Sequence, residues 1–276
     1  MNRLMKISIL LLSILSLVAC GSEETNSSET NESKNTKQKE EESGKLLTEE
    51  EFTKMFSDPK KYKGSKVEYF GRIFTEPEKD DEGTYLQVFA DDNDELNTIV
   101  AINDPNLTVK TDDIIHITGT VTDVFKGENL MGGTIVAPAI KADKIEISDY
   151  ATAFAPAIKT IDVNQEMDQH GYLLKLNKIE LAENETRAYV TITNNTQDTI
   201  SFYTFNTKLV VGNTQYEENN EFNYPEIQSD ILPGVTTEGI IVFPVIPESR
   251  ELKIFAEGSS ENYELDFTPF EFTISY

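Results

Sequence analysis

Over much of this chain apolar residues recur at every second position, which is the repeat of β-strands with one buried face. In the first half, such segments separated by turn residues predict five strands, at residues 66–75, 84–91, 97–102, 113–125 and 134–147. In the second half, the same pattern predicts strands at residues 172–181, 187–194, 200–211, 236–245, 251–256 and 263–274. The pattern therefore predicts a mostly β protein with two β-domains.

One short helix is predicted ahead of the first strand. Thr48 followed by Glu51 is the spacing of a capping box, in which each residue satisfies a backbone amide of the other. Phe52 and Met55 then lie on one apolar side. Pro59 ends the helix, because proline cannot continue its hydrogen-bond ladder.

Two features of the first strands bear on their packing. Alternate residues from Val67 to Ile73 share one face, and Gly71 among them suggests a bend where a barrel curves. On the next strand Tyr85 and Phe89 also alternate. Packing in the core is a simpler interpretation of these two rings than a stacking surface for nucleic acid.

The N-terminus has the three parts of a secretory signal. Arg3 and Lys6 are its positive start, residues 7–18 are apolar, and Ala19 is a small residue before the single cysteine, Cys20. The apolar run is shorter than the about 20 residues that a membrane-spanning helix needs. The segment after Cys20 is polar and acidic rather than basic, which also argues against a span.

The residues Leu17-Val18-Ala19-Cys20 resemble the lipobox of bacterial lipoproteins. That resemblance implies cleavage after Ala19 and a diacylglyceryl thioether on Cys20, where a sulfur nucleophile takes the lipid. Two or more acyl chains anchor a protein stably to a membrane. The alternative is an ordinary signal peptide followed by a chance cysteine, and the position and flanking residues of Cys20 argue against it.

Residues 20–45 consist mainly of Ser, Thr, Asn, Glu and Lys. Such a segment buries too little apolar surface to offset its chain entropy, so we expect a disordered acidic tether. As a flexible coil it would reach about 25–30 Å. Its acidic run, residues 40–42, is typical of a solvated segment rather than of a partner site.

The chain is strongly acidic, with 49 Asp and Glu against 24 Lys and Arg, and a formal net charge of −25. Such a charge repels phosphate backbones and anionic lipids, which excludes nucleic acid as the main partner. The partner is expected to be neutral, cationic or bridged by divalent cations. With one cysteine the protein has no disulfide, so its cores must hold it together.

Catalysis finds little support in the sequence, and no cofactor is expected. The two histidines, His116 and His170, have no metal-ligand spacing and no cysteine partner. His116 lies inside a predicted strand and His170 at a loop-to-strand junction, where structural roles are the simpler interpretation. There is no glycine-rich phosphate loop and no serine elbow.

One turn concentrates oxygen ligands of the kind that calcium prefers. Asp91, Asp92, Asp94 and Glu95 are its weak candidates for a metal site. The turn lacks the glycine at position six and the glutamate at position twelve of an EF-hand. A solvated hairpin turn is therefore the preferred interpretation.

Short sequence phrases point to two fold families. KYKGSKV at 61–67 and ITGTV at 117–121 resemble the tRNA-anticodon-like OB-fold domains of exported bacterial proteins, over residues 46–148. VTITNNT at 190–196, LVVGNTQY at 209–216, and LPG at 232–234 leading to GIIVFPV at 239–245 resemble the telokin-like, immunoglobulin-like domains of bacterial surface lipoproteins.

These resemblances imply a five-stranded OB-like barrel at 46–148, a linker at 149–157 and an immunoglobulin-like β-sandwich at 158–276. They carry over no ligand and no active site. We expect a non-catalytic, lipid-anchored extracytoplasmic protein of Gram-positive type that binds a surface protein, peptide or wall component. The alternative is a lipoprotein that holds a solute or divalent cation in its barrel.

Overall fold

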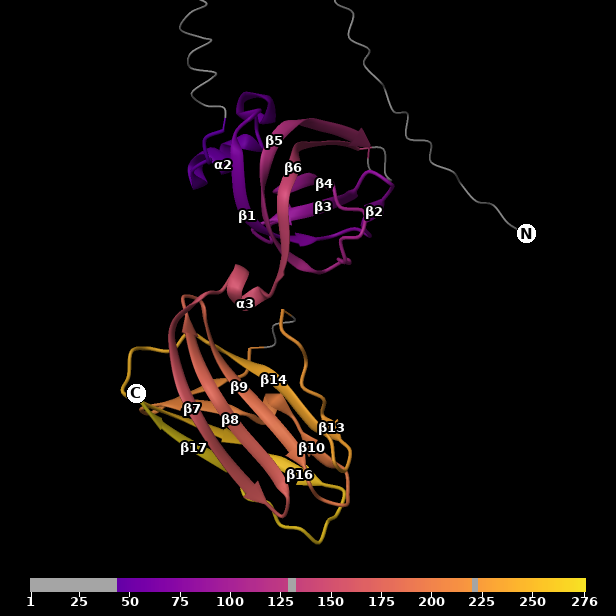
Figure 1. The fold of residues 1–276 in the computed structure, drawn as a ribbon. Coiled ribbons are helices and arrows are strands. Elements are labelled where there is room, and N and C mark those ends of the chain that lie inside the picture. The colour runs from indigo at the N-terminus through magenta and orange to yellow at the C-terminus, as the bar shows by residue number, and fades with distance from the viewer. Residues whose placement is uncertain (1–43, 129–132, 220–222) are drawn as a thin grey trace, which may run out of the picture. The chain divides into compact units, whose positions relative to one another are not determined.

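The computed structural model describes residues 44–128, 133–219 and 223–276, and Figure 1 shows their arrangement. The protein is mostly β with a short N-terminal helix, as the hydropathy pattern predicts. One sheet closes on itself and three further sheets follow it along the chain, which is compatible with an OB-like barrel and a sandwich. The predicted signal peptide, Cys20 and residues 20–43 of the tether lie outside the described residues.

The helix α2 (Glu49–Met55) forms as its capping box predicts. The Thr48 side chain accepts a hydrogen bond from the Glu51 amide at 3.3 Å, and the Thr48 amide donates to Glu51 Oε2 at 3.0 Å. Phe52 and Met55 are buried, so one side of the helix packs on the barrel core. A 3-10 helix, η1 (Pro59–Tyr62), follows α2.

The barrel is one sheet of strands in the order β1-β5-β6-β4-β3-β2, and a second pairing of β1 with β3 closes the ring (Figure 1). β4 and β6 pair in parallel, whereas the other neighbours are antiparallel. The strands are β1 (Lys66–Ile73), β2 (Glu78–Lys79), β3 (Thr84–Ala90), β4 (Asn97–Ile102), β5 (Ile114–Glu128) and β6 (Thr134–Ser148). Five of them match the predicted strands closely, and the two-residue β2 is additional.

Gly71 lies where β1 pairs with both of its neighbours, opposite Ala90 of β3 and Ile115 of β5. A Cβ at this position would lie 2.4 Å from Val88 Cγ1 and 2.8 Å from Phe89 O. Only glycine therefore allows β3 to approach β1 closely enough to close the ring.

The interpretation of Tyr85 and Phe89 as core residues is wrong. Burial alternates along β3 so that Leu86, Val88 and Ala90 fill the barrel, and the two rings lie on the outer face. Phe89 stacks on Phe74 with ring centroids 3.7 Å apart and an interplanar angle of 8°. The Tyr85 hydroxyl donates to Asp80. The sequence shows the alternation of β3 correctly. The buried face, however, is the one that carries Leu86, Val88 and Ala90.

A short helix, α3 (Tyr150–Ala153), follows β6, and its N-cap Asp149 accepts from the Thr152 amide. The chain then forms a four-stranded sheet in the order β14-β9-β8-β7, visible as one layer in Figure 1. Its strands are β7 (Ala157–Gln169), β8 (Tyr172–Ala182), β9 (Glu185–Asn194) and β14 (Thr236–Pro244).

Two smaller sheets complete the sandwich. The first has the order β12-β11-β15-β17, with β11 (Lys208–Val211), β12 (Thr214–Glu217), β15 (Glu251–Ala256) and β17 (Phe270–Ser275). The second has the order β13-β10-β16, with β10 (Ile200–Phe202), β13 (Asp230–Ile231) and β16 (Gly258–Ser260). A core of alternate residues from all these sheets holds them together, as in a sandwich.

The sandwich differs from the predicted strands in several places. β7 and the short strands β12, β13 and β16 were not anticipated, and the predicted strand at 263–274 contains regular structure only from Phe270. The predicted strand at 200–211 is broken after Phe202 by a 3-10 turn, η2 (Thr204–Asn206). Gly212 and Gly234 lie in the left-handed region at φ 59° and 76°, which glycine adopts without strain.

Candidate functional site: an acidic hollow on the sandwich

A hollow of about 260 Å³ opens beside β14, between η2 and the chain that leads from β12 to β13. Its volume suits one side chain rather than a drug-sized ligand, for which pockets of roughly 300–1,000 Å³ are usual. The residues that line it are Thr204, Glu218, Asn219, Tyr224, Pro225, Glu226, Ile227, Ser229, Ile240 and Val242. None of these ten is Lys, Arg or His, so the hollow is acidic.

The chain after β12 is held against β14 by a few specific contacts. The Asn219 amide donates to Val242 O at 2.8 Å, which attaches the segment to the outer edge of the strand. Further along, Ile227 packs on Gly239, where a Cβ would lie 2.2 Å from Ile227 Cγ1. The Phe202 amide donates to Ser229 O at 2.8 Å. These contacts bring two glutamates and two hydroxyls to one place.

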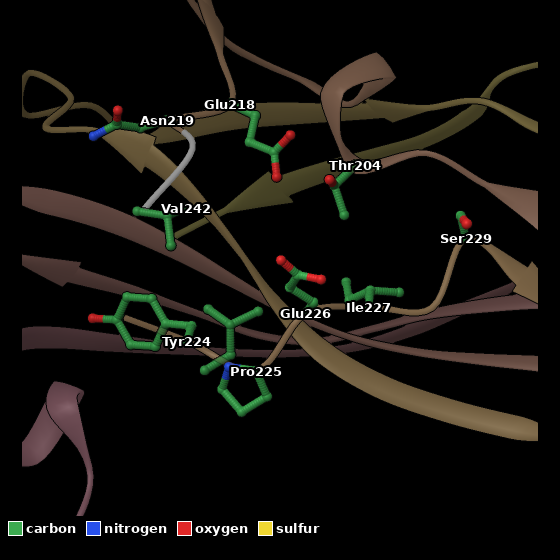
Figure 2. Close-up of a pocket in the computed structure, with 10 residues that line it drawn as sticks. Thr204, Glu218, Asn219, Tyr224, Pro225, Glu226, Ile227, Ser229 and Val242 are labelled. Carbon is green, nitrogen blue, oxygen red and sulfur yellow. The ribbon is translucent and has the colours of Figure 1, made fainter. Parts of the chain in front are cut away.

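Glu218 is the chemically unusual member of this group. Its Oε2 atom is buried and has no hydrogen-bond partner in the part of the chain that the structure describes. Figure 2 shows the carboxylates of Glu218 and Glu226 turned toward one another, with the Thr204 side chain beside them. A buried carboxylate oxygen without a partner is costly, so this arrangement favours a bound cationic donor.

A second polar cluster lies nearby, on the outer face of the β7-β8-β9-β14 sheet. Outward residues of a sandwich usually meet solvent, yet Arg187 of β9 is 0% exposed. Its Nε and Nη2 donate to Glu180 Oε2 at 3.1 and 2.8 Å. Its Nη1 donates to Glu185 Oε1 at 2.5 Å and to the Tyr224 hydroxyl at 3.1 Å. A further bond from Nη1 to Ala155 O, at 2.7 Å, ties the segment after α3 to the sheet.

Burial and hydrogen bonds in this cluster shift the pKa values of Glu180 and Tyr224. Burial would raise the pKa of Glu180, but hydrogen bonds from Lys178, Tyr189 and Arg187 outweigh it and leave that pKa below its usual value. Burial and the hydrogen bond to Glu185 raise the pKa of Tyr224, which keeps its phenol protonated. In this cluster the two acids, Glu180 and Glu185, are thus paired with the two bases, Arg187 and Lys178.

Tyr224 connects this network to the acidic hollow. The residue lines the hollow of Figure 2 and also a second cavity of about 590 Å³ over Lys178, Glu180 and Tyr189. The Tyr224 hydroxyl donates to Glu185 and accepts from Arg187, and these two hydrogen bonds hold the ring in position. The network therefore supports one wall of the acidic hollow.

The four candidate metal ligands in the β3–β4 turn, Asp91, Asp92, Asp94 and Glu95, do not converge. Asp91 and Asp92 both have left-handed backbones, at φ 53° and 55°. Arg72 holds the Asp92 carboxylate with two bonds of 2.6 and 2.7 Å. Over the described ranges, no group of three or more His, Cys, Asp or Glu is placed to hold a metal ion.

Asp91 instead lines a hollow of about 280 Å³ between α2 and β1, together with Glu49, Glu68, Phe52 and Phe70 among others. Burial, and then the charge of Glu49, raise the pKa of Asp91. The lining of this hollow contains acids and no base, so its negative charge is not balanced within it.

The histidines have local partners. His116 stacks on Phe70 at 4.6 Å, and its Nε2 lies 3.1 Å from Glu68 Oε1. His170 occupies the β7–β8 turn at φ 59°, with Nε2 3.1 Å from Asp266 O. Neither arrangement places a nucleophile beside the ring.

Comparisons with known proteins identify no family for the chain. No protein-family model matches the chain, and no curated protein matches it. Among solved structures, a functionally unknown protein from Listeria monocytogenes EGD-e is similar with a TM-score of 0.31 and 10% identity. The similarity covers 37% of this chain and 73% of that one, and it carries no argument about function. Of the helices that the structure describes, none is long and apolar enough to cross a membrane.

Proposed function

We propose that the protein is a lipid-anchored, extracytoplasmic binding protein that takes a cationic group of its partner into the acidic hollow of the sandwich. The observation that carries the proposal is the buried Oε2 atom of Glu218, which lacks a hydrogen-bond partner within the described chain and faces Glu226. An ammonium or guanidinium group supplies the missing donor and compensates both charges.

The lining of the hollow suits a lysine side chain in particular. An ammonium group has three donors, for which Glu218, Glu226 and the Thr204 hydroxyl are available acceptors. Ile227 and Val242 form apolar wall on which the four-carbon stem of lysine packs. The strong negative charge of the whole chain attracts such a partner before contact.

The expected lipid on Cys20 would make a site of modest affinity sufficient. Confinement to a membrane surface raises the local concentration of the sandwich near other surface molecules. A single charge-assisted contact then suffices for capture without catalysis. In this proposal the partner is a surface protein, a peptide or a wall component that displays a free amine.

A thermal-shift titration with Nα-acetyl-lysine N-methylamide tests the proposal, because its only charge is the side-chain ammonium. Stabilisation should saturate with ligand. The Glu218→Gln variant should bind roughly tenfold more weakly or worse, since a charge-assisted hydrogen bond contributes about 1.5–3 kcal/mol. Nα-acetyl-norleucine N-methylamide lacks the charge. Its affinity for the wild-type protein should be no higher than the affinity of the lysine ligand for Glu218→Gln.

Glu166→Gln is the matched control, because Glu166 is an exposed acid of β7 far along the chain from the hollow. It should leave the titration unchanged. Equal binding by wild type and Glu218→Gln, or equal binding of the lysine and norleucine ligands, would show that the hollow is not a cation site.

The hollow between α2 and β1 favours a second candidate function, capture of a small organic cation by the barrel. Asp91 and Glu49 supply uncompensated charge there, and Phe52 and Phe70 supply apolar and aromatic surface. A titration with tetramethylammonium distinguishes the two sites. Asp91→Asn should abolish binding if the barrel is responsible, whereas Glu218→Gln should abolish it if the sandwich is.

A further inference from the structure

Two aromatic side chains stand exposed on either side of Thr204, whose own side chain lines the acidic hollow. Tyr203 is 38% exposed and Phe205 is 59% exposed. Their ring centroids lie 5.4 Å apart at an interplanar angle of 33°, so the rings form one small aromatic surface. We call Tyr203 and Phe205 the aromatic pair.

The turn that carries the aromatic pair is well fixed. The Asn206 amide donates to Tyr203 O at 3.0 Å, and the Thr207 amide donates to Thr204 O at 2.8 Å, which closes η2. Lys208 Nζ donates to Phe205 O at 2.9 Å and also pairs with Glu217. Rings exposed on a rigid backbone lose little entropy when they bind, and aromatic residues are enriched at the energetic centres of protein interfaces.

The position of the pair is not required by the core. β10 ends at Phe202, which is 1% exposed, and β11 resumes at Lys208, with Leu209 at 0% exposed. The chain between these strands instead exposes both rings, on the two residues that flank Thr204 of the acidic hollow.

The charges around the turn define which partner fits. Lys208 is the basic residue nearest the pair along the chain, and Glu217 pairs with it. The described residues that line the hollow include Glu218 and Glu226 but no Lys, Arg or His. An acidic hollow beside an apolar surface is complementary to a segment with a cationic side chain next to an apolar one.

We infer that this surface docks a polypeptide segment of a partner protein in which a lysine is flanked by a large apolar residue. The lysine enters the acidic hollow, and the apolar side chain covers the aromatic pair. This inference rests on the proposed function of the hollow and adds the class of partner. A protein partner would contact both the hollow and the aromatic pair, whereas a free amine would contact the hollow alone.

Two blocked peptides test the inference, acetyl-Phe-Lys-Phe-amide and acetyl-Ser-Lys-Ser-amide, each titrated against the full protein. The phenylalanine peptide should bind roughly tenfold more tightly, because burying one aromatic side chain supplies a gain of that size. In Phe205→Ala that advantage should disappear, while the affinity for Nα-acetyl-lysine N-methylamide stays the same. Tyr263→Ala removes another exposed ring, 96% accessible, and should change nothing.

The outcomes separate the two proposals. If both peptides bind equally, or if Phe205→Ala keeps the advantage of the phenylalanine peptide, the docking inference is overturned and the cation site stands. If no lysine ligand binds, the cation site fails and the inference fails with it. A circular-dichroism spectrum and an unfolding curve show that Phe205→Ala remains folded.

Discussion

Replacement of Arg187 by alanine tests the energetic role of the buried network. Its side chain is 1% exposed, and those of its partners Glu180 and Glu185 are 10% and 6% exposed. Alanine removes the cation that pairs with Glu185, leaves Glu180 with Lys178 alone, and removes the bond to Ala155 O. Breaking a buried ion pair from one side costs about 3–5 kcal/mol, mostly because the remaining charge is stranded.

At about 2–4 °C of melting temperature per kcal/mol for a chain of roughly this size, Arg187→Ala should melt about 6–20 °C below wild type. Urea unfolding followed by far-UV circular dichroism measures the free energy directly. Arg72→Ala is the matched control, because its pair with Asp92 is 22% and 25% exposed. That control should lose only about 1 kcal/mol.

A compensated variant keeps the reasoning testable if Arg187→Ala does not fold. Arg187→Met combined with Glu180→Leu and Glu185→Leu removes both buried carboxylates together with the cation and should recover more than half of the lost stability. The reasoning is refuted if Arg187→Ala loses less than about 1 kcal/mol. It is equally refuted if the triple variant is less stable than the single one.

Three further changes have defined outcomes. Gly71→Ala should cost about 1–3 kcal/mol in urea unfolding, because its Cβ would collide with Val88. In the folded protein the pKa of Glu180 lies below its usual value of 4.5. The stability that ionised Glu180 gives the fold is therefore fully present above pH 4.5 and is lost as the pH falls below 4.5. Glu180→Gln should flatten that acid-side loss in unfolding curves taken at several pH values. Thr48→Ala should cost about 1 kcal/mol of unfolding free energy by removing the cap on the Glu51 amide.

The sequence predicted the elements that have one clearly buried face, and it failed on those that do not. β7 is an edge strand along which Ile161 is the one buried residue, so it shows no strong alternation. The segment from Tyr203 to Thr207 contains residues that favour strands, yet hydrogen bonds within η2 turn the chain. In both places tertiary contacts override the local pattern.

The residues of the candidate site could not be found from the sequence for a related reason. Glu218 and Glu226 occur in a polar, acidic stretch that is typical of a solvated loop. A backbone bond from Asn219 to Val242 brings that stretch onto β14. Arg187 occupies an outward position on its strand and is covered by Ala155 and Tyr224, which lie 32 and 37 residues away. No local signal in the sequence marks such contacts.

Mapping of the bound lysine ligand by nuclear magnetic resonance tests the central claim most directly. Amide resonances of the ¹⁵N-labelled protein would be followed during titration with Nα-acetyl-lysine N-methylamide. The proposed cation site predicts saturable shifts centred on Thr204, Glu218 and Ser229, and their loss in Glu218→Gln. Shifts centred on any other part of the protein, or no shifts at millimolar ligand, would contradict it.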